Sequence, residues 1–371
     1  MRAVDRADAF QRRHPVLGYP IGVVYKFIDD QGAYLAALIT YYGFLSVFPL
    51  ILLLQSALGF FIHGNERLHK QILDSVLGQI PVLGNTLSNA APSALRGSVS
   101  GIVLGSVVAL YGGLGVAQAL QHTSNTCWSV PRNSRPNPIL MRVRSAAVLL
   151  FLGVALVSLG WLPQTWHAPG WLVLALNLVF GTVIFLLLMK MTTARGQGWG
   201  RLAPGALLVT VVWQLFMAAG STFTKIFGAR SSDIYGTYGS ILTILVACYI
   251  MAVAFVVGCE VNVVLHRRLY PRSLMTQFTD DVDLTLADQQ AYTLQSTMQR
   301  FKNYQAIDVV FDKNNDGVAD QPSDLDLRWH DAVDAHEQWL KRGHPTRPSG
   351  MWGLTAEVED NRSVEDRKSV V

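Results

Sequence analysis

The chain has 371 residues, of which half are apolar and 15% are charged, and its mean hydropathy is +0.28. It is too apolar for an ordinary soluble protein of this length and is predicted to be an all-α, polytopic membrane protein. The net charge of +4 comes from basic residues at the ends of apolar runs, so nucleic-acid binding is not expected. Cys127, Cys248 and Cys259 lack the spacing of a metal or redox motif, and neither a metal nor a cofactor is predicted.

The N-terminal region, residues 1–34, is predicted to be cytoplasmic and to carry an interfacial helix. Residues 1–13 are rich in arginine and lack the apolar core of a cleavable signal peptide. Apolar side chains then occur at mixed spacing over residues 16–33, in a run that contains Asp29 and Asp30. This helix is too charged to span a membrane, so we expect it to lie amphipathically on the surface.

Six apolar runs within residues 35–268 are long enough to cross the hydrocarbon layer, which takes about 20 residues. The predicted spans are residues 35–62, 97–120, 145–162, 171–189, 203–223 and 235–265. Pro49 is expected to kink the first span, because proline removes a helix hydrogen bond. Small residues recur every four positions in the second span: Gly97, Gly101, Gly105, Ala109 and Gly113. This row favours close helix packing, possible between two copies of the chain.

Basic residues predict the orientation of these spans. Six spans put both termini on one side of the membrane. The loops and termini on that side, including the polar connection at residues 121–144, hold about three times as many basic residues as the opposite side. Both termini are therefore predicted to be cytoplasmic.

The C-terminal region, residues 269–371, is acidic and polar and is predicted to be largely disordered, with short helices such as residues 325–340. The run from Asp312 to Asp320 resembles the first nine positions of a calcium-binding loop. Position 12 of that loop is Ser323 instead of glutamate, and Pro322 prevents the usual exiting helix. An Asx-rich turn is therefore favoured over a calcium site.

Several motifs resemble those of one bacterial protein family. They are Thr40-Tyr41-Tyr42 with Ser46 and Pro49, Asn125-Thr126-Cys127-Trp128, Pro204-Gly205-Ala206, the run 235–239, and Gly258-Cys259-Glu260-Val261-Asn262. Over about residues 20–268 the chain resembles the YihY/BrkB family of bacterial inner-membrane proteins. The resemblance implies a six-span helical fold and a role in envelope integrity, with movement of a lipid or solute suspected. Relatives were once labelled ribonuclease BN, but this chain has no histidine and aspartate cluster of metal-ligand spacing, so it is not expected to be an enzyme.

Glu260 is the leading candidate site residue. A charged side chain costs about 2.5–3.5 kcal/mol at the centre of a membrane helix and less near an interface, so Glu260 needs a partner, a wet cavity or a proton. Intramembrane acids often mark substrate or proton paths. The alternative is a structural pair with Lys190, a cytoplasmic arginine or the neighbourhood of Asn262.

The other candidates surround Pro49 and the start of the sixth span. Tyr42 and Ser46 are four residues apart and share a helix face, which either lines a polar cavity or satisfies the backbone that Pro49 leaves open. Tyr238 is either an interfacial anchor or part of the same cavity. The predicted substrate-binding set is Tyr41, Tyr42, Ser46, Pro49, Tyr238, Glu260 and Asn262.

These observations predict an inner-membrane protein that supports the cell envelope, with membrane lipids as partners and a lipid or amphiphilic solute as the transported substrate. The competing hypothesis is a scaffold that transports nothing. In that case the face formed by Gly97, Gly101 and Gly105 joins copies of the chain or docks a partner, and Glu260 is structural.

Overall fold

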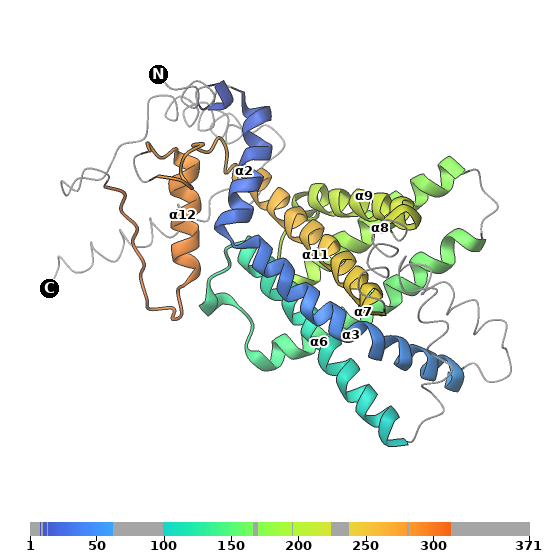
Figure 1. The fold of residues 1–371 in the computed structure, drawn as a ribbon. Helices are drawn as coiled ribbons and strands as arrows, with labels where there is room; N and C mark the ends of the chain where they lie inside the picture. The colour runs from blue at the N-terminus through green and yellow to red at the C-terminus, as the bar shows by residue number, and fades with distance from the viewer. Residues whose placement is uncertain are drawn as a thin grey trace, which may run out of the picture. The chain divides into compact units, whose positions relative to one another are not determined.

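The regular structure of the described part of the chain is helical, as predicted (Figure 1). The computed structural model describes residues 8, 10–12, 14–61, 99–165, 170–194, 196–223, 237–279 and 282–312. Within these residues the elements are α2 (Pro15–Asp29), α3 (Gly32–Phe61), α6 (Val99–Cys127), the 3-10 helix η1 (Arg132–Ser134), α7 (Pro138–Thr165), α8 (Gly170–Thr192), α9 (Trp199–Phe223), α11 (Thr237–Arg267) and α12 (Leu286–Met298).

Four of the described helices are long and apolar enough to cross a membrane. The segments lie in α7, α8, α9 and α11 and correspond to the predicted third to sixth spans. Half of the residues in the α11 segment are buried, against 17% in the α7 segment. The helices α3 and α6, with 30 and 29 residues, occupy the positions of the predicted first and second spans. The count of six spans and the kink at Pro49 stay predictions.

The chain forms two compact units. One contains Gly22–Val263 and Thr293–Asp308, and so holds most of every candidate span. The other combines Met1–Ile21, Val264–Tyr292 and Val309–Val371. The division predicted from composition, at residues 34 and 268, stays a prediction.

A sharp corner separates α2 from α3. The predicted interfacial helix ends four residues early, at Asp29, because Asp30 and Gln31 form a turn. Gln31 has a φ of 56°, in the left-handed region that ends a right-handed helix. Gly32 follows because a Cβ there would lie 2.4 Å from the ring of Phe27.

Glycines of α6 allow two neighbouring helices to approach. A Cβ on Gly115 would lie 2.2 Å from the ring of Tyr42, and one on Gly112 would lie 3.0 Å from the backbone of Ser46. Tyr42 and Ser46 therefore share the face of α3 that packs on α6. Gly113, from the predicted row of small residues, packs within the chain, because a Cβ there would lie 2.9 Å from the side chain of Leu149 of α7. Gly101 and Gly105 lie in α6, and Gly97 lies outside the described residues.

The connection predicted at residues 121–144 is shorter than expected, because α6 continues to Cys127 and α7 starts at Pro138. Buried polar side chains explain the error. Gln121 donates from Nε2 to Ser145 Oγ at 2.8 Å, and Asn125 Oδ1 accepts from the backbone amide of Ala194 at 2.7 Å. Hydropathy assigns such residues to a loop, although their hydrogen bonds to α7 and to the residues that follow α8 make them part of the packed bundle.

The C-terminal region is ordered over residues 269–279 and 282–312, so the prediction of a largely disordered region is wrong for this stretch. Thr285 caps α12: its Oγ1 accepts from the amide of Asp288 at 3.1 Å, and Asp288 Oδ2 accepts from the amide of Thr285 at 3.0 Å. Asp288 also pairs with Arg272, and both are fully buried. The predicted helix at 325–340 and residues 313–320 of the calcium-like run lie outside the described residues.

Asp288→Ala is expected to destabilise this region by about 3–5 kcal/mol, because it leaves the Arg272 guanidinium buried without its carboxylate and removes half of the cap. Limited proteolysis of the full chain in detergent micelles, followed by mapping of cleavage within residues 269–312, measures the effect. Asp308→Ala is the matched control, since Asp308 is exposed and such changes stay within about 0.5 kcal/mol. Equal protease resistance of the two variants would contradict a stabilising role for the pair.

Candidate functional site

The position of Glu260 follows from the packing of α11 on α9. Gly258 and Asn262 are four residues apart on α11 and so lie on one helix face. A Cβ on Gly205 of α9 would lie 1.9 Å from the carbonyl oxygen of Gly258, and the Gly205 amide donates to Asn262 Oδ1 at 2.7 Å. Asn262 Nδ2 also contacts Met189 Sδ of α8 at 3.4 Å. Glu260, two residues from each, projects from the other side of α11.

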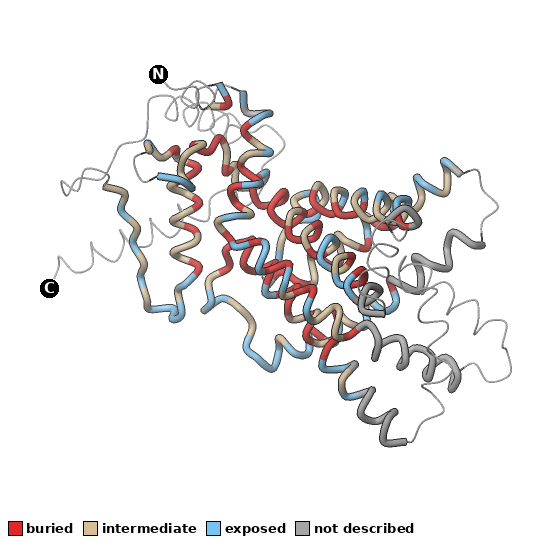
Figure 2. The backbone as a smooth tube through the Cα atoms, in the orientation of Figure 1, coloured by how far each residue is buried: buried red, intermediate tan, exposed pale blue. Residues whose placement is uncertain are grey.

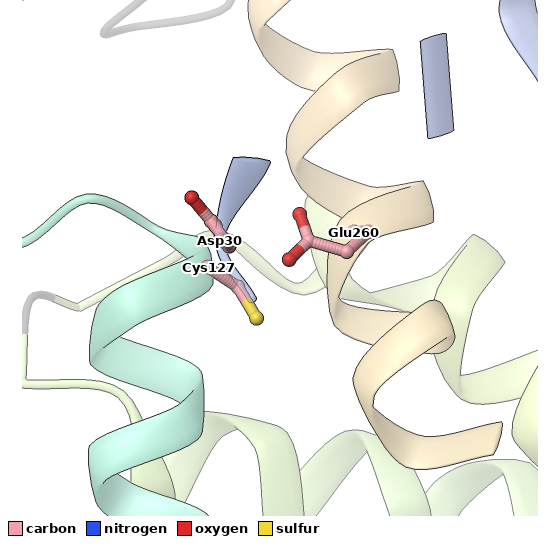
Figure 3. Close-up of side chains that lie close together, drawn as sticks. All are labelled: Asp30, Cys127 and Glu260. Atoms are coloured by element: carbon pink, nitrogen blue, oxygen red, sulfur yellow. The ribbon is translucent and has the colours of Figure 1, made fainter. Parts of the chain in front are cut away.

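There Glu260 meets three side chains from other parts of the sequence. Lys26 Nζ lies 3.8 Å from Glu260 Oε2, pairs with Asp30 Oδ2, and donates to the carbonyl oxygen of Cys127 at 3.4 Å. The potential ligand atoms of Asp30, Cys127 and Glu260 all lie within 4.8 Å of one another. Figure 3 shows the Glu260 carboxylate directed from α11 toward Asp30 and Cys127. We call Lys26, Asp30, Cys127 and Glu260 the buried charge cluster.

The buried charge cluster is closed to solvent and unevenly charged. Glu260 and Cys127 are 0% exposed, Lys26 is 2% exposed and Asp30 is 6% exposed. Figure 2 shows that buried residues extend along much of α11 and of the neighbouring parts of α3 and α6. One ammonium group faces two carboxyl groups. Lys26 donates to Asp30, but neither oxygen of Glu260 accepts a hydrogen bond from the described residues. A buried, unsatisfied carboxylate costs several kcal/mol, so the cluster favours a further proton or cation.

Burial and the neighbouring charges both shift the pKa values of Lys26 and Asp30, at the corner between α2 and α3. Burial lowers the pKa of Lys26, but the attraction of Asp30 and Glu260 outweighs it, and the pKa of Lys26 is raised. Burial raises the pKa of Asp30, and the neighbouring Lys26 opposes this rise without cancelling it. Lys26 therefore stays protonated at neutral pH, while Asp30 takes up a proton more readily than an exposed aspartate.

The partner of Glu260 differs from those expected. Lys190, one of the alternative partners named from the sequence, lies elsewhere, because its Nζ is over the ring of Trp199, 3.4 Å from the ring centroid. Asn262 binds α9 and α8 instead of Glu260. The cation beside Glu260 is Lys26.

The aromatic candidates of α3 form a separate group. Tyr42 and Ser46 pack on α6, and Ser46 Oγ donates to the carbonyl oxygen of Gly43 at 2.9 Å. Tyr41 is 60% exposed and meets the Tyr42 ring edge to face at 5.1 Å. Ser46 lies about 20 Å along the α3 axis from the corner that holds Asp30, at 1.5 Å per residue. The described structure therefore separates these residues from Glu260.

Two further candidates lie at the edge of what the structure describes. Pro49 is within α3 and Tyr238 is within α11, but their side chains lie outside the described residues.

Comparison with known proteins places the chain in a family. The family model described as Virulence factor BrkB matches residues 23–280, which is more than half of the chain. The chain belongs to the BrkB family. The matched range contains all four residues of the buried charge cluster and the contact between Gly205 and Gly258.

Two curated proteins are distantly similar to the chain. The chain is 26% identical to the inner membrane protein YhjD of Escherichia coli (strain K12) over 203 residues, which are 47% of this chain and 59% of YhjD. It is 28% identical to an uncharacterized protein of Dickeya dadantii (strain 3937) over 123 residues, 32% of this chain and 38% of that protein. The matches thus span less than two thirds of either relative. No solved structure matches the chain.

Sequence reasoning missed Lys26, Asp30 and Cys127 as site residues of this BrkB-family chain. One signal was visible: Lys26 and Asp30 are four residues apart and share a helix face, as ion pairs on helices do. Cys127 lies inside the motif that begins at Asn125. Their meeting with Glu260 depends on the packing of α2, α6 and α11, which the spacing of residues does not reveal.

A segment that follows the last candidate span packs near the buried charge cluster. Gln295 Nε2 donates to the carbonyl oxygen of Asp29 at 2.6 Å. Farther along, Asn133 Nδ2 donates to Asn303 Oδ1 at 2.7 Å, and the Arg132 guanidinium lies 4.9 Å from the Phe301 ring centroid. Residues 293–308 thus hold the corner after α2 and the loop around η1.

Proposed function

We propose that the chain is a non-enzymatic transporter of the bacterial inner membrane that moves a lipid or amphiphilic solute and so supports the cell envelope. Its termini are cytoplasmic, six helices span the membrane, and Glu260 couples movement to a proton. The observation that carries the proposal is the burial of Glu260 with an ammonium group at 3.8 Å and no hydrogen bond to its oxygens from the described residues. Inner-membrane location is supported by the apolar helices and by the likeness to YhjD.

The coupling follows from the charge of the buried charge cluster. When Glu260 is ionised, it attracts Lys26 and holds the α2 to α3 corner against α11. A proton on Glu260 removes that attraction, while Lys26 stays paired with Asp30. The two protonation states therefore favour different positions of the corner relative to α11, which is what a proton-driven alternation between two conformations requires.

Glu260→Gln is expected to abolish proton-driven flux, because glutamine keeps the size of the side chain and loses the titratable group. The measurement is transfer of labelled phospholipid between leaflets, or efflux of an amphiphilic dye, in proteoliposomes with an imposed pH gradient. We expect a decrease of about tenfold or more for Glu260→Gln and no change for Asp308→Asn, which alters an exposed acid. Flux that the pH gradient drives equally well in Glu260→Gln and intact protein would refute the coupling.

A scaffold without transport is the competing proposal, and the Lys26 to Asp30 pair favours it, since that pair gives the buried charge cluster a structural use. In this case the small residues of α6, including Gly101 and Gly105, join copies of the chain. Intact protein that forms stable oligomers in nanodiscs, yet supports no flux under several gradients, would favour the scaffold.

A further inference from the structure

We propose that Asp30, Cys127 and Glu260 bind a thiophilic divalent cation of the Zn²⁺ class. The inference concerns the site of the proposed transport function, but binding of the metal does not require transport. The three residues come from the α2 to α3 corner, the end of α6 and the C-terminal part of α11, so a bound cation would join three separate parts of one compact unit.

The ligand atoms are close to the spacing that zinc imposes. Zinc binds cysteine sulfur at about 2.3 Å and carboxylate oxygen at about 2.0–2.2 Å, which places tetrahedral ligands about 3.4–3.6 Å apart. One sulfur and two carboxylate oxygens here lie within 4.8 Å of one another before any metal is bound. Shifts of about 1 Å, which side-chain rotation can supply, would bring the three ligand atoms to the spacing of a zinc site. Cys259, which is buried and adjacent to Glu260 on α11, is a candidate for a fourth ligand.

Glu260 supplies an independent indication of a ligand. It is 0% exposed, it is directed toward Asp30 and Cys127, and its two oxygens accept no hydrogen bond from the described residues (Figure 3). Lys26 Nζ, at 3.8 Å, is beyond hydrogen-bond distance from Glu260 and donates to Asp30 Oδ2 instead. Both oxygens of Glu260 thus lack a hydrogen-bond donor among the described residues, and a carboxylate oxygen of Asp30 lies within 4.8 Å of the ligand atoms of Glu260 and Cys127.

The charge balance favours a dication. On binding, the S–H bond of Cys127 breaks, a sulfur–metal bond forms, and the proton passes to solvent. The cluster then holds three negative groups, namely the thiolate and two carboxylates, against a dication and the Lys26 ammonium. The net charge of the cluster with the bound cation is then zero, as a site closed to solvent requires. The sulfur ligand selects Zn²⁺ or Cd²⁺ over Mg²⁺ or Ca²⁺, which prefer oxygen alone.

The test is a titration of the full-length, chelator-treated protein in detergent with Cd²⁺ and with Zn²⁺. Sulfur-to-cadmium charge-transfer absorption and calorimetry report the binding. We expect one cation per chain, and affinity weaker by about tenfold or more in Cys127→Ser and in Glu260→Gln. Cys248→Ser is the matched control, because Cys248 lies three turns earlier on α11, partly exposed, and should leave binding unchanged.

Each outcome decides between the proposals. Equal affinity in Cys127→Ser and intact protein, or no binding by intact protein whose helical circular dichroism is normal, would overturn the metal site. Asp30→Asn provides a second variant in case Cys127→Ser does not fold, and it too should weaken binding. Metal binding without flux would leave the site standing and refute transport, whereas proton-driven flux without metal binding would do the reverse.

Discussion

Lys26→Met is expected to lower the free energy of unfolding at neutral pH by about 3–5 kcal/mol, because it leaves two buried carboxyl groups without their ammonium. Methionine keeps the length of the lysine stem, so packing is largely retained and the effect is one of charge. Lys26 is 2% exposed, and Asp30 and Glu260 lie within 4 Å of its Nζ. No other basic side chain of the described residues is paired with Glu260.

The loss caused by Lys26→Met should depend on pH. In the intact chain burial raises the pKa of Asp30 and Lys26 opposes the rise, so removing Lys26 raises that pKa further. A carboxyl group whose pKa is higher in the folded state than in the unfolded state stabilises the fold below its unfolded pKa. That contribution is lost as pH rises through the folded pKa. The deficit should therefore be small in mild acid and grow toward neutral pH, with Glu260, Cys127 and Asp29 as the other titratable groups close to Asp30.

Thermal unfolding of the intact chain and the variant in the same detergent, at a series of pH values, checks this prediction. Lys302→Met is the matched control, because residue 302 is exposed. The double variant Lys26→Met/Asp30→Asn should recover part of the loss, since it removes one of the two carboxyl groups. If Lys26→Met were no less stable than Lys302→Met at neutral pH, the cluster would not be held together by charge.

Apolar helices were predictable because their signal is local. A run of about 20 apolar residues forms a helix in a membrane, because every backbone amide there must be hydrogen-bonded within the segment. The predicted spans in α8 and α11 accordingly agree with the structure to within a few residues at each end. The prediction ended the second span at residue 120, whereas α6 continues to Cys127, because the signal there is not local. Its buried Gln121 and Asn125 read as polar loop residues, and only their partners on other elements show that they are packed.

Other features carried a local signal that composition concealed. Thr285 and Asp288 have the spacing of a capping box, so the start of α12 could have been predicted from the sequence. The acidic and polar character of residues 269–371 predicted disorder instead. Glu260 was predictable as a candidate site residue because an acid within an apolar run carries an energetic cost. Its partners could not be predicted from the sequence, because Lys26 is 234 positions earlier in the chain and contacts Glu260 only through tertiary packing.

Gly205→Ala is expected to destabilise the membrane bundle by about 3 kcal/mol or more, at the upper end of the cost of overpacking. The added Cβ would lie 1.9 Å from the carbonyl oxygen of Gly258 and 2.5 Å from Asn262 Nδ2. A backbone oxygen in the middle of a helix cannot rotate away, so relief requires α11 to move off α9. That movement also breaks the hydrogen bond from the Gly205 amide to Asn262.

The control for this prediction lies on the same helix. A Cβ on Gly200 meets nothing within 4 Å, so Gly200→Ala should be neutral or stabilising by up to about 1 kcal/mol through helix propensity alone. Because Glu260 lies between Gly258 and Asn262, displacement of α11 in Gly205→Ala should also weaken Cd²⁺ binding, whereas Gly200→Ala should not. Comparable melting temperatures for both variants would show that α11 shifts freely, and the packing of α9 on α11 would then not be what fixes Glu260 against Lys26 and Asp30.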